Sequence, residues 1–367
     1  MRLFKQIVGI LIVAVALSYA IAPVYDFPEA ASFSGPHIWN PYQEIHGTWK
    51  RANFHAHGES WGGITNGAQT DAQVVTAYWA AGYQIATVSD YQHIADGVDT
   101  IPVYEHGFNL GKHHQLAIGA RSVSWWDVPL WQGVNQKQFV IDQLRPTTEL
   151  ISLNHPSRLR AYSVDDFRQL TGYELIELAN GRFTTEDRWD AALSSGRPAF
   201  AIGGDDTHDI NDREHMAVAW NMLDAESTSA RDVLDALRHG RSYVVVRKVD
   251  TPMNSDIALD RLTADDRTMT VTLTGTPAEI AFVGQDGNVR QRSNGLTASY
   301  TFTAADTYIR TNIQTQRTLL YLNPVIRSDS DNDQPAMPQA ETDGLLTWAL
   351  RVGIVAVCSM VAWLLVL

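Results

Sequence analysis

Asn53-Phe54-His55-Ala56-His57-Gly58 is the stretch of sequence from which the organisation of this chain is best understood. His55 and His57 are two positions apart, so on an extended segment both side chains point to the same side. Imidazole is a common ligand of zinc, iron and manganese, and two histidines at a strand end offer two ligands on one rigid element. Taken alone, the stretch is equally compatible with two ordinary histidines near a turn.

Three further apolar, strand-like runs end in aspartate or histidine and supply Asp90, His155, Asp206 and His208. Helical patterns lie between the runs, and several of them are followed directly by glycine. Alternating strands and helices predict a βα barrel, closed or nearly closed, in which the C-terminal ends of the strands meet at one mouth. We therefore expect these side chains to form a single site.

Composition narrows the class of protein. A chain of 367 residues with 45% hydrophobic residues suits two domains with accessory segments. Its formal charge of −13 argues against nucleic acid as a partner, because a sequence-independent grip on phosphates needs clustered Lys and Arg. The single cysteine, Cys358, excludes an internal disulfide and a multi-thiolate metal site.

Both ends of the chain are apolar. Residues 1–24 begin with basic residues and then carry no charge, which fits a signal anchor or a cleaved signal peptide. Residues 344–367 are uncharged except for Arg351 and predict a C-terminal transmembrane helix. The basic start favours an N-terminus on the cytoplasmic side, which places the main domains outside.

Between these ends we expect four segments. Residues 25–46 are a turn-rich linker, residues 47–249 the metal-dependent barrel, and residues 250–325 a small antiparallel β-sandwich marked by alternating strands. Residues 326–343 are a polar, proline-containing spacer before the tail helix.

Four motifs resemble, in order and spacing, those of the PHP (polymerase and histidinol phosphatase) superfamily. They are His55-x-His57, Ser89-Asp90, Asn154-His155-Pro156 and Gly204-Asp205-Asp206-Thr207-His208, and the resemblance covers about residues 49–248. It implies a distorted (β/α)7 barrel, up to three divalent metals at its mouth and phosphoester hydrolysis. It also implies a set of metal ligands, namely His55, His57, His155, Asp206 and His208.

The sequence departs from the family pattern at four positions. The histidine or acid expected after the first motif is absent at Trp61-Gly62-Gly63, and a histidine expected before the His-Pro motif has no clear counterpart. Tyr91 follows Asp90 where the family has histidine, so His93 is a candidate replacement ligand. Arg121 stands where the family has a bridging glutamate, and we expect its guanidinium to replace a metal's charge or to bind phosphate. With these ligands missing, one or two ions of Zn, Mn or Fe are expected rather than three. No pattern places the segment that contains His106, His113 and His114, and surface exposure is expected for them.

The expected chemistry follows from such a site. A bound divalent metal lowers the pKa of water and so provides hydroxide as the nucleophile. Asp206 or Asp90 would accept the proton, and arginine would offset charge on the phosphoryl oxygens. Asp90 is alternatively expected to orient a histidine without touching metal.

The predicted function is therefore a membrane-anchored, extracytoplasmic metal-dependent hydrolase, a phosphoesterase acting on a small phosphorylated or glycan-linked substrate. One alternative is a degenerate barrel that binds glycan or protein without catalysis, using Trp125, Trp126 and Trp131 for stacking on sugars. Another is metal-dependent hydrolysis of a different bond, since a fold does not choose its chemistry.

Overall fold

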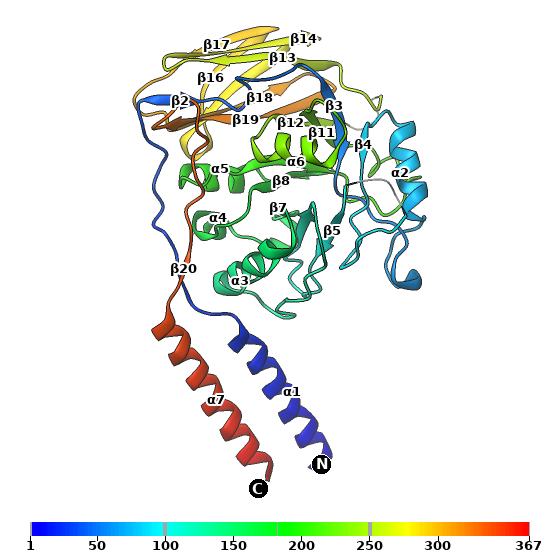
Figure 1. Cartoon of the computed structure of the whole chain (residues 1–367), viewed down its shortest axis with the longest axis vertical. Coiled ribbons are helices and arrows are strands. Elements are labelled where there is room, and N and C mark those ends of the chain that lie inside the picture. Colours follow the sequence, from blue (N-terminus) through cyan, green and yellow to red (C-terminus); the bar gives the residue numbers. More distant parts are fainter. Residues whose placement is uncertain (1, 98–100, 182, 249–251, 367) are drawn as a thin grey trace.

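The computed structural model describes residues 2–97, 101–181, 183–248 and 252–366, and shows a mixed α/β protein with an apolar helix at each end (Figure 1). One sheet has nine strands. Eight follow one another in the order β16 (Asn288–Gly295), β15 (Ala278–Gly284), β18 (Tyr308–Gln314), β19 (Thr318–Ser328), β12 (Ser242–Arg247), β11 (Ala219–Asp224), β3 (Trp49–Asn53) and β4 (Ile85–Ala86), and β2 (His37–Trp39) pairs with β19.

The second sheet has six strands and carries much of the predicted site. Its order is β10 (Phe200–Gly204), β8 (Leu175–Asn180), β7 (Leu150–Leu153), β6 (Gln115–Ile118) and β5 (Val103–His106), with β9 (Phe183–Thr184) beside β8. Strands β10, β8 and β7 are parallel, whereas β6 runs antiparallel to both β7 and β5. The strands β7, β8 and β10 are buried along almost their whole length, as expected for parallel strands covered on both faces.

The helices are α2 (Asp71–Ala80), α3 (Val134–Leu144), α4 (Val164–Gln169), α5 (Glu186–Ser194) and α6 (Ala230–Arg238). Three of them begin at a capping Ser or Thr side chain. The side chains of Thr70, Ser163 and Ser229 each accept a hydrogen bond from the backbone N–H three residues on. The Ser163 backbone N–H in turn donates to the Asp166 carboxylate, which completes a capping box.

The expected closed barrel is not confirmed. The nine-stranded and six-stranded sheets are separate ladders, and the isolated bridges between them join Ala56 to Thr207 and Tyr91 to Glu105. The hairpin of β5 and β6 interrupts the βα alternation that the sequence suggested, because its antiparallel strands need no crossover helix. Both bridges lie beside the residues of the predicted site, so the two sheets approach each other there.

From Ile257 to Ser328 the chain forms mainly antiparallel β-structure. Strands β13 (Ile257–Ala264), β14 (Thr268–Gly275) and β17 (Thr297–Thr301) form a three-stranded sheet at the upper end in Figure 1. Leu259, Val271, Phe282 and Ile313 belong to one buried apolar cluster, which joins this sheet to the nine-stranded one. Since β19 also pairs with β12, the C-terminal strands continue the sheet that begins near the site.

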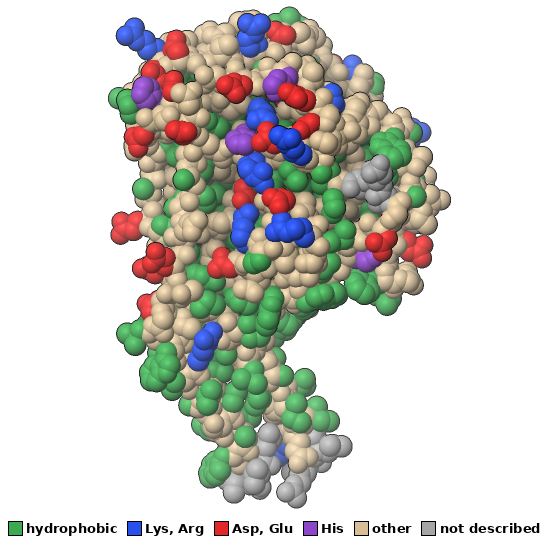
Figure 2. Space-filling model, viewed as in Figure 1, with side chains coloured by type: hydrophobic (Ala, Val, Ile, Leu, Met, Phe, Trp, Pro, Cys, Tyr) green, Lys and Arg blue, Asp and Glu red, His purple; other side chains and the backbone are tan. Residues whose placement is uncertain are grey.

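Helices α1 (Arg2–Ile21) and α7 (Gly344–Val366) lie side by side and extend away from the rest of the molecule (Figure 1). By length and composition both are apolar enough to cross a membrane, and Figure 2 shows their hydrophobic surface. Strands β1 (Tyr25–Asp26) and β20 (Glu341–Thr342) pair where the two helices meet the globular part. The Arg351 guanidinium donates to the carbonyl oxygen of Ala20 at 3.0 Å.

Candidate metal centre

His55, His57 and Asp206 come together because the segments after β3 and β10 hydrogen-bond to each other. The His57 N–H donates to the Thr207 carbonyl at 2.9 Å, and the Asp206 N–H donates to the His55 carbonyl at 3.0 Å. The Asp206 Oδ1 atom lies 3.3 Å from His55 Nε2 and 3.2 Å from His57 Nε2. All three side chains are almost fully buried.

Glu105, on β5, is the residue that connects the cluster. Its Oε1 lies 3.4 Å from His55 Nε2, and its Oε2 lies 3.3 Å from His57 Nε2. The same Oε1 lies 2.9 Å from both His114 Nδ1 and His155 Nε2. Two groups of potential ligands therefore share this one carboxylate, the first with His55, His57 and Asp206 and the second with His114 and His155.

Glu177, on β8, orients His55. Its Oε1 lies 2.6 Å from His55 Nδ1, and its Oε2 accepts the backbone N–H of His155 at 2.7 Å. A carboxylate on one imidazole nitrogen leaves the other nitrogen free to bind a metal. Gly204 makes this approach possible, because a Cβ there would lie 2.6 Å from Glu177 Oε1 and 2.7 Å from His55 Cβ.

The charges of the cluster reinforce one another. Burial opposes ionisation of Glu105, but the neighbouring His114 and His55 hold its pKa well below the usual range. Burial likewise opposes ionisation of Asp206, and His55 and His208 hold its pKa well below normal. Burial disfavours the charged form of His55, yet Glu177, Asp206 and Glu105 raise its pKa well above normal. The carboxylates of Glu105 and Asp206 thus favour the protonated form of His55, while burial lowers the pKa of His114 and His208.

The backbone at two of these positions is strained. His155 has a backbone φ of 27° and Asp206 a φ of 50°, values that residues other than glycine rarely adopt. Each residue lies two positions beyond the end of a parallel strand, His155 after β7 and Asp206 after β10. Strain of this kind costs on the order of 1–3 kcal/mol per residue and is concentrated at functional sites.

The donor set fits a divalent cation. The potential ligand atoms within each of the two groups lie within 4.8 Å of one another. Glu105 Oε2 is buried without a hydrogen-bond partner, and His55 Nε2 and His57 Nε2 face each other at 3.3 Å. Buried polar atoms are nearly always satisfied, and a cation between these atoms would satisfy them. Imidazole and carboxylate together suit Zn, Mn or Fe.

A cavity of about 780 Å³ opens beside the cluster and is lined by His155, Arg158, Asn180, Asp206 and His208, among others. His208 stacks on His57 with ring centroids 4.3 Å apart, and its Nε2 is 3.5 Å from Asp206 Oδ1. Arg158 is half-exposed, and its Nη1 lies 3.0 Å from Asp206 Oδ2. The candidate metal ligand Asp206 and Arg158 thus share one wall of the cavity.

Two predicted residues, Asp90 and His93, lie beside the cluster. Asp90 is buried and its Oδ1 accepts the backbone N–H of Gly58 at 2.8 Å, so it holds the segment that carries His57. His93 is partly exposed, with its Nδ1 3.9 Å from Asp90 Oδ2. Neither belongs to the two ligand groups. Asp205 accepts hydrogen bonds from Tyr78 and from the amides of residues 217–219, a structural role.

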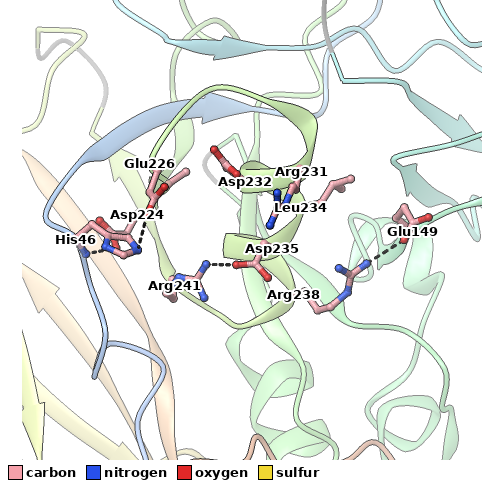
Figure 3. Close-up of a pocket in the computed structure, with 11 residues that line it drawn as sticks. His46, Glu149, Asp224, Glu226, Arg231, Asp232, Leu234, Asp235, Arg238 and Arg241 are labelled. Carbon is pink, nitrogen blue, oxygen red and sulfur yellow. Dashed lines mark hydrogen bonds and ion pairs between the residues drawn. The ribbon is translucent and has the colours of Figure 1, made fainter.

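Arg121 lies at the opposite end of the sheet from the cluster, so the expectation that it contributes to the site is wrong. It follows β6, and because β6 is antiparallel to β7, its C-terminal end lies where β7 begins. There the Arg121 guanidinium pairs with Glu149, which lines a different cavity together with Arg238 and Asp224 (Figure 3). Asp224 pairs with Trp49 at the start of β3, the end of that strand away from His55.

Sequence reasoning missed Glu105, His114 and Glu177. His106, His113 and His114, expected on the surface, are all buried. The signal that could have found the two glutamates is a single acidic residue inside an apolar run, as in Val103-Tyr104-Glu105 and Leu175-Ile176-Glu177-Leu178. A carboxylate at a buried strand position needs a cationic or hydrogen-bonding partner.

No model of a known protein family matches the chain, and no curated protein sequence matches it. A structural similarity is found with a two-domain protein from Bacteroides vulgatus described as containing a predicted PHP-like metal-dependent phosphoesterase. The two share 12% sequence identity with a TM-score of 0.42, over 83% of this chain and 98% of the other. A similarity at this TM-score does not establish a shared fold.

Proposed function

We propose that the protein is a metal-dependent phosphoester hydrolase anchored to a membrane, with one or two divalent ions in the buried centre. The observation that carries the proposal is the sharing of Glu105 between two groups of buried ligands. His55, His57, Glu105 and Asp206 would hold one ion, and Glu105, His114 and His155 would hold the other. A divalent ion in such a centre lowers the pKa of a bound water and offsets charge on phosphoryl oxygens.

The chain's own residues then have distinct tasks. Arg158 reaches the cavity from the exposed side and binds phosphate oxygens as a planar, permanently charged group. Of the two aspartates considered as proton acceptors, Asp206 lies in the cluster and Asp90 does not, so Asp206 takes this role. Glu177 keeps His55 in place, and burial of the cluster excludes bulk water.

The same observations argue against a degenerate, non-catalytic barrel. That alternative depended on the absence of a carboxylate at the position of Arg121. Glu105 supplies a carboxylate from β5, buried and surrounded by histidines within 2.9–3.4 Å. A centre of six convergent buried ligand side chains is more than a sugar-binding surface needs.

Membrane anchoring is proposed on the basis of α1 and α7, which are long and apolar enough to span a bilayer. An extracytoplasmic position of the globular part follows from the basic residues at the start of α1. The proposed substrate is a small phosphorylated or glycan-linked molecule, and no nucleic acid partner is proposed.

The test is the metal content of the purified full-length chain, beside a double variant His55→Ala, Asp206→Ala. We expect stoichiometric Zn, Mn or Fe in the wild type and at least a tenfold loss in the double variant. Hydrolysis of aryl phosphate mono- and diesters should follow metal content. Failure of the wild type to bind any of these metals when they are offered in excess would falsify the proposal.

The phosphate-binding role of Arg158 is tested separately. Arg158→Ala should retain its metal and raise KM for the aryl phosphate roughly tenfold, since a charge-assisted hydrogen bond contributes about 1.5–3 kcal/mol. Arg168→Ala is the matched control, because Arg168 is exposed on α4 and pairs with Asp165. Equal kinetics for both variants would remove Arg158 from the site.

A further inference from the structure

Five large apolar side chains are exposed on two neighbouring loops next to the terminal helices. Each is 51–74% exposed, and together they form what we call the aromatic surface: Phe108, Leu110, Trp125, Trp126 and Trp131. They lie within 24 residues of sequence, whereas Trp79 on α2 and Val289 on β16 are exposed on separate elements. A gathered apolar patch marks a surface of interaction.

The loops that carry this surface are well ordered by internal hydrogen bonds. Asp127 is buried and accepts hydrogen bonds from the Phe108 N–H at 2.8 Å and from the Gln132 side chain at 2.6 Å. The Leu110 N–H donates to the Pro129 carbonyl at 2.9 Å, which joins one loop to the other. Hydrogen bonds thus join the two loops to each other and to the buried Asp127, while the large apolar side chains are exposed.

A direct contact sets the position of these loops relative to the membrane helix. The Tyr19 hydroxyl, in the last turn of α1, donates to the Trp131 carbonyl at 2.7 Å. At the same level of the helix pair, Thr347 of α7 bonds to Val24, and the neighbouring Trp348 is exposed. Tyr and Trp are concentrated at the two interfaces of a bilayer, where one part of the ring is apolar and the other wet.

The aromatic surface also continues to the rim of the metal centre. Trp125 contacts Trp61 with ring centroids 5.9 Å apart, and the Trp61 indole donates to the Tyr91 carbonyl at 2.8 Å. Tyr91 in turn stacks on His57 at 4.5 Å. Aromatic side chains therefore connect Trp125, in the aromatic surface, to His57 of the candidate metal centre.

We propose that the aromatic surface lies in the interfacial layer of the bilayer that α1 and α7 span, and holds the rim of the metal centre close to the lipid headgroups. The inference rests on the proposed membrane anchor, and it adds a second contact between the globular part and the membrane. Burying exposed apolar area contributes about 25 cal/mol per Å², so several indole rings together give a stable orientation.

The experiment measures immersion depth on the full-length chain in phosphatidylcholine vesicles. Spin labels are attached to Cys358 in the wild type, and to Trp125→Cys, Trp131→Cys and Trp79→Cys in a Cys358→Ser background. Collision with oxygen, which partitions into lipid, is compared with collision with a water-soluble nickel chelate. Trp79 is the matched control, since it is an exposed tryptophan on α2.

We expect the ratio of oxygen to nickel collision to be several-fold higher at positions 125 and 131 than at position 79. Equal ratios at the three positions, with Cys358 immersed, would overturn the interfacial contact and leave the anchor intact. If the Cys358 label is itself exposed to nickel, the anchor fails and the inference fails with it. Metal content of each labelled variant verifies that the protein is folded.

Discussion

Asp90 is a buried carboxyl group whose surroundings disfavour its ionised form. Burial and the neighbouring carboxylate of Asp71 raise its pKa from 3.8 to about 7. Between these values the native state holds a proton that the unfolded chain has released, so the free energy of unfolding falls as the pH rises through this window. Asp90 is thus neutral in mildly acidic solution, although the sequence suggests an ionised catalytic base.

The variant Asp90→Asn tests this ionisation. The amide oxygen can still accept the Gly58 N–H, but no proton is taken up on folding. In metal-free, full-length protein we expect the melting temperature of the variant, relative to the wild type, to rise as the pH increases through the window. A difference independent of pH would contradict the raised pKa. Asp209→Asn, a change at a partly exposed aspartate that lines the cavity and has a lowered pKa, serves as the control.

The candidate ligand residues show how far sequence reasoning reaches at the scale of single residues. His55, His57, His155 and Asp206 follow parallel strands, and a strand's C-terminal end is a place where sequence pattern and function coincide. Glu105 lies inside a strand, where an alternating pattern gives no reason to single it out. Its role depends on the neighbouring strand β6, which brings His114 beside it. The pairing of two strands cannot be predicted from the sequence pattern of one strand alone.

At the scale of elements, the hairpin of β5 and β6 accounts for the main differences from the prediction. A βα barrel requires every strand to deliver its C-terminal end to the mouth. Because β6 is antiparallel to β7, the first residue of β6, next to His114, lies at the end of the sheet that carries the site. Arg121, which follows β6, lies at the opposite end. One reversed strand therefore exchanges an expected arginine for an unexpected histidine in the site.

Helix α5 is attached to the C-terminal strands by a buried ion pair. Arg310, on β18, donates to both carboxylate oxygens of Asp190 at 2.7 Å, and its side chain is 2% exposed. Glu186 accepts a further bond from Arg310 at 3.0 Å. The ion pair therefore links α5 to strand β18 of the nine-stranded sheet.

Asp190→Ala should lower the free energy of unfolding by about 3 kcal/mol, since loss of one partner of a buried pair leaves the other charge uncompensated. The expected value is at the lower end of the usual range because Glu186 remains near Arg310. Denaturant unfolding in detergent micelles measures the change. Asp187→Ala on the same helix, where the carboxylate is exposed, should change stability by less than about 0.5 kcal/mol. Equal effects would show that the buried pair contributes nothing particular.

At the scale of the whole molecule, the two terminal helices act as a unit that sequence alone could not assemble. The apolar composition of each end predicts a span, but it leaves open whether residues 1–24 are cleaved. In the structure the Arg351 guanidinium donates to the carbonyls of Ala20 and Ile21, at the C-terminal end of α1. Free carbonyls at a helix end carry partial negative charge, which favours a cation there.

This contact predicts that α1 is retained in the mature protein. A charged residue within an apolar helix is expensive in lipid unless it has partners, and removal of α1 would take away the two carbonyl partners of Arg351. Both free ends of the helices lie together at the far end from the globular part (Figure 1). We therefore expect epitope tags at the N- and C-termini to be detected together, on the side opposite the globular part.

The measurement uses cells that express the doubly tagged chain. An impermeant maleimide should label Asn332→Cys in intact cells, in a Cys358→Ser background, because residue 332 lies in the spacer before α7 and is exposed. Both tags should become accessible to antibody only after permeabilisation. A mature protein without the N-terminal tag would mean that Arg351 is satisfied without α1, and that the helix pair, including the Tyr19 contact to Trp131, is not part of the working molecule.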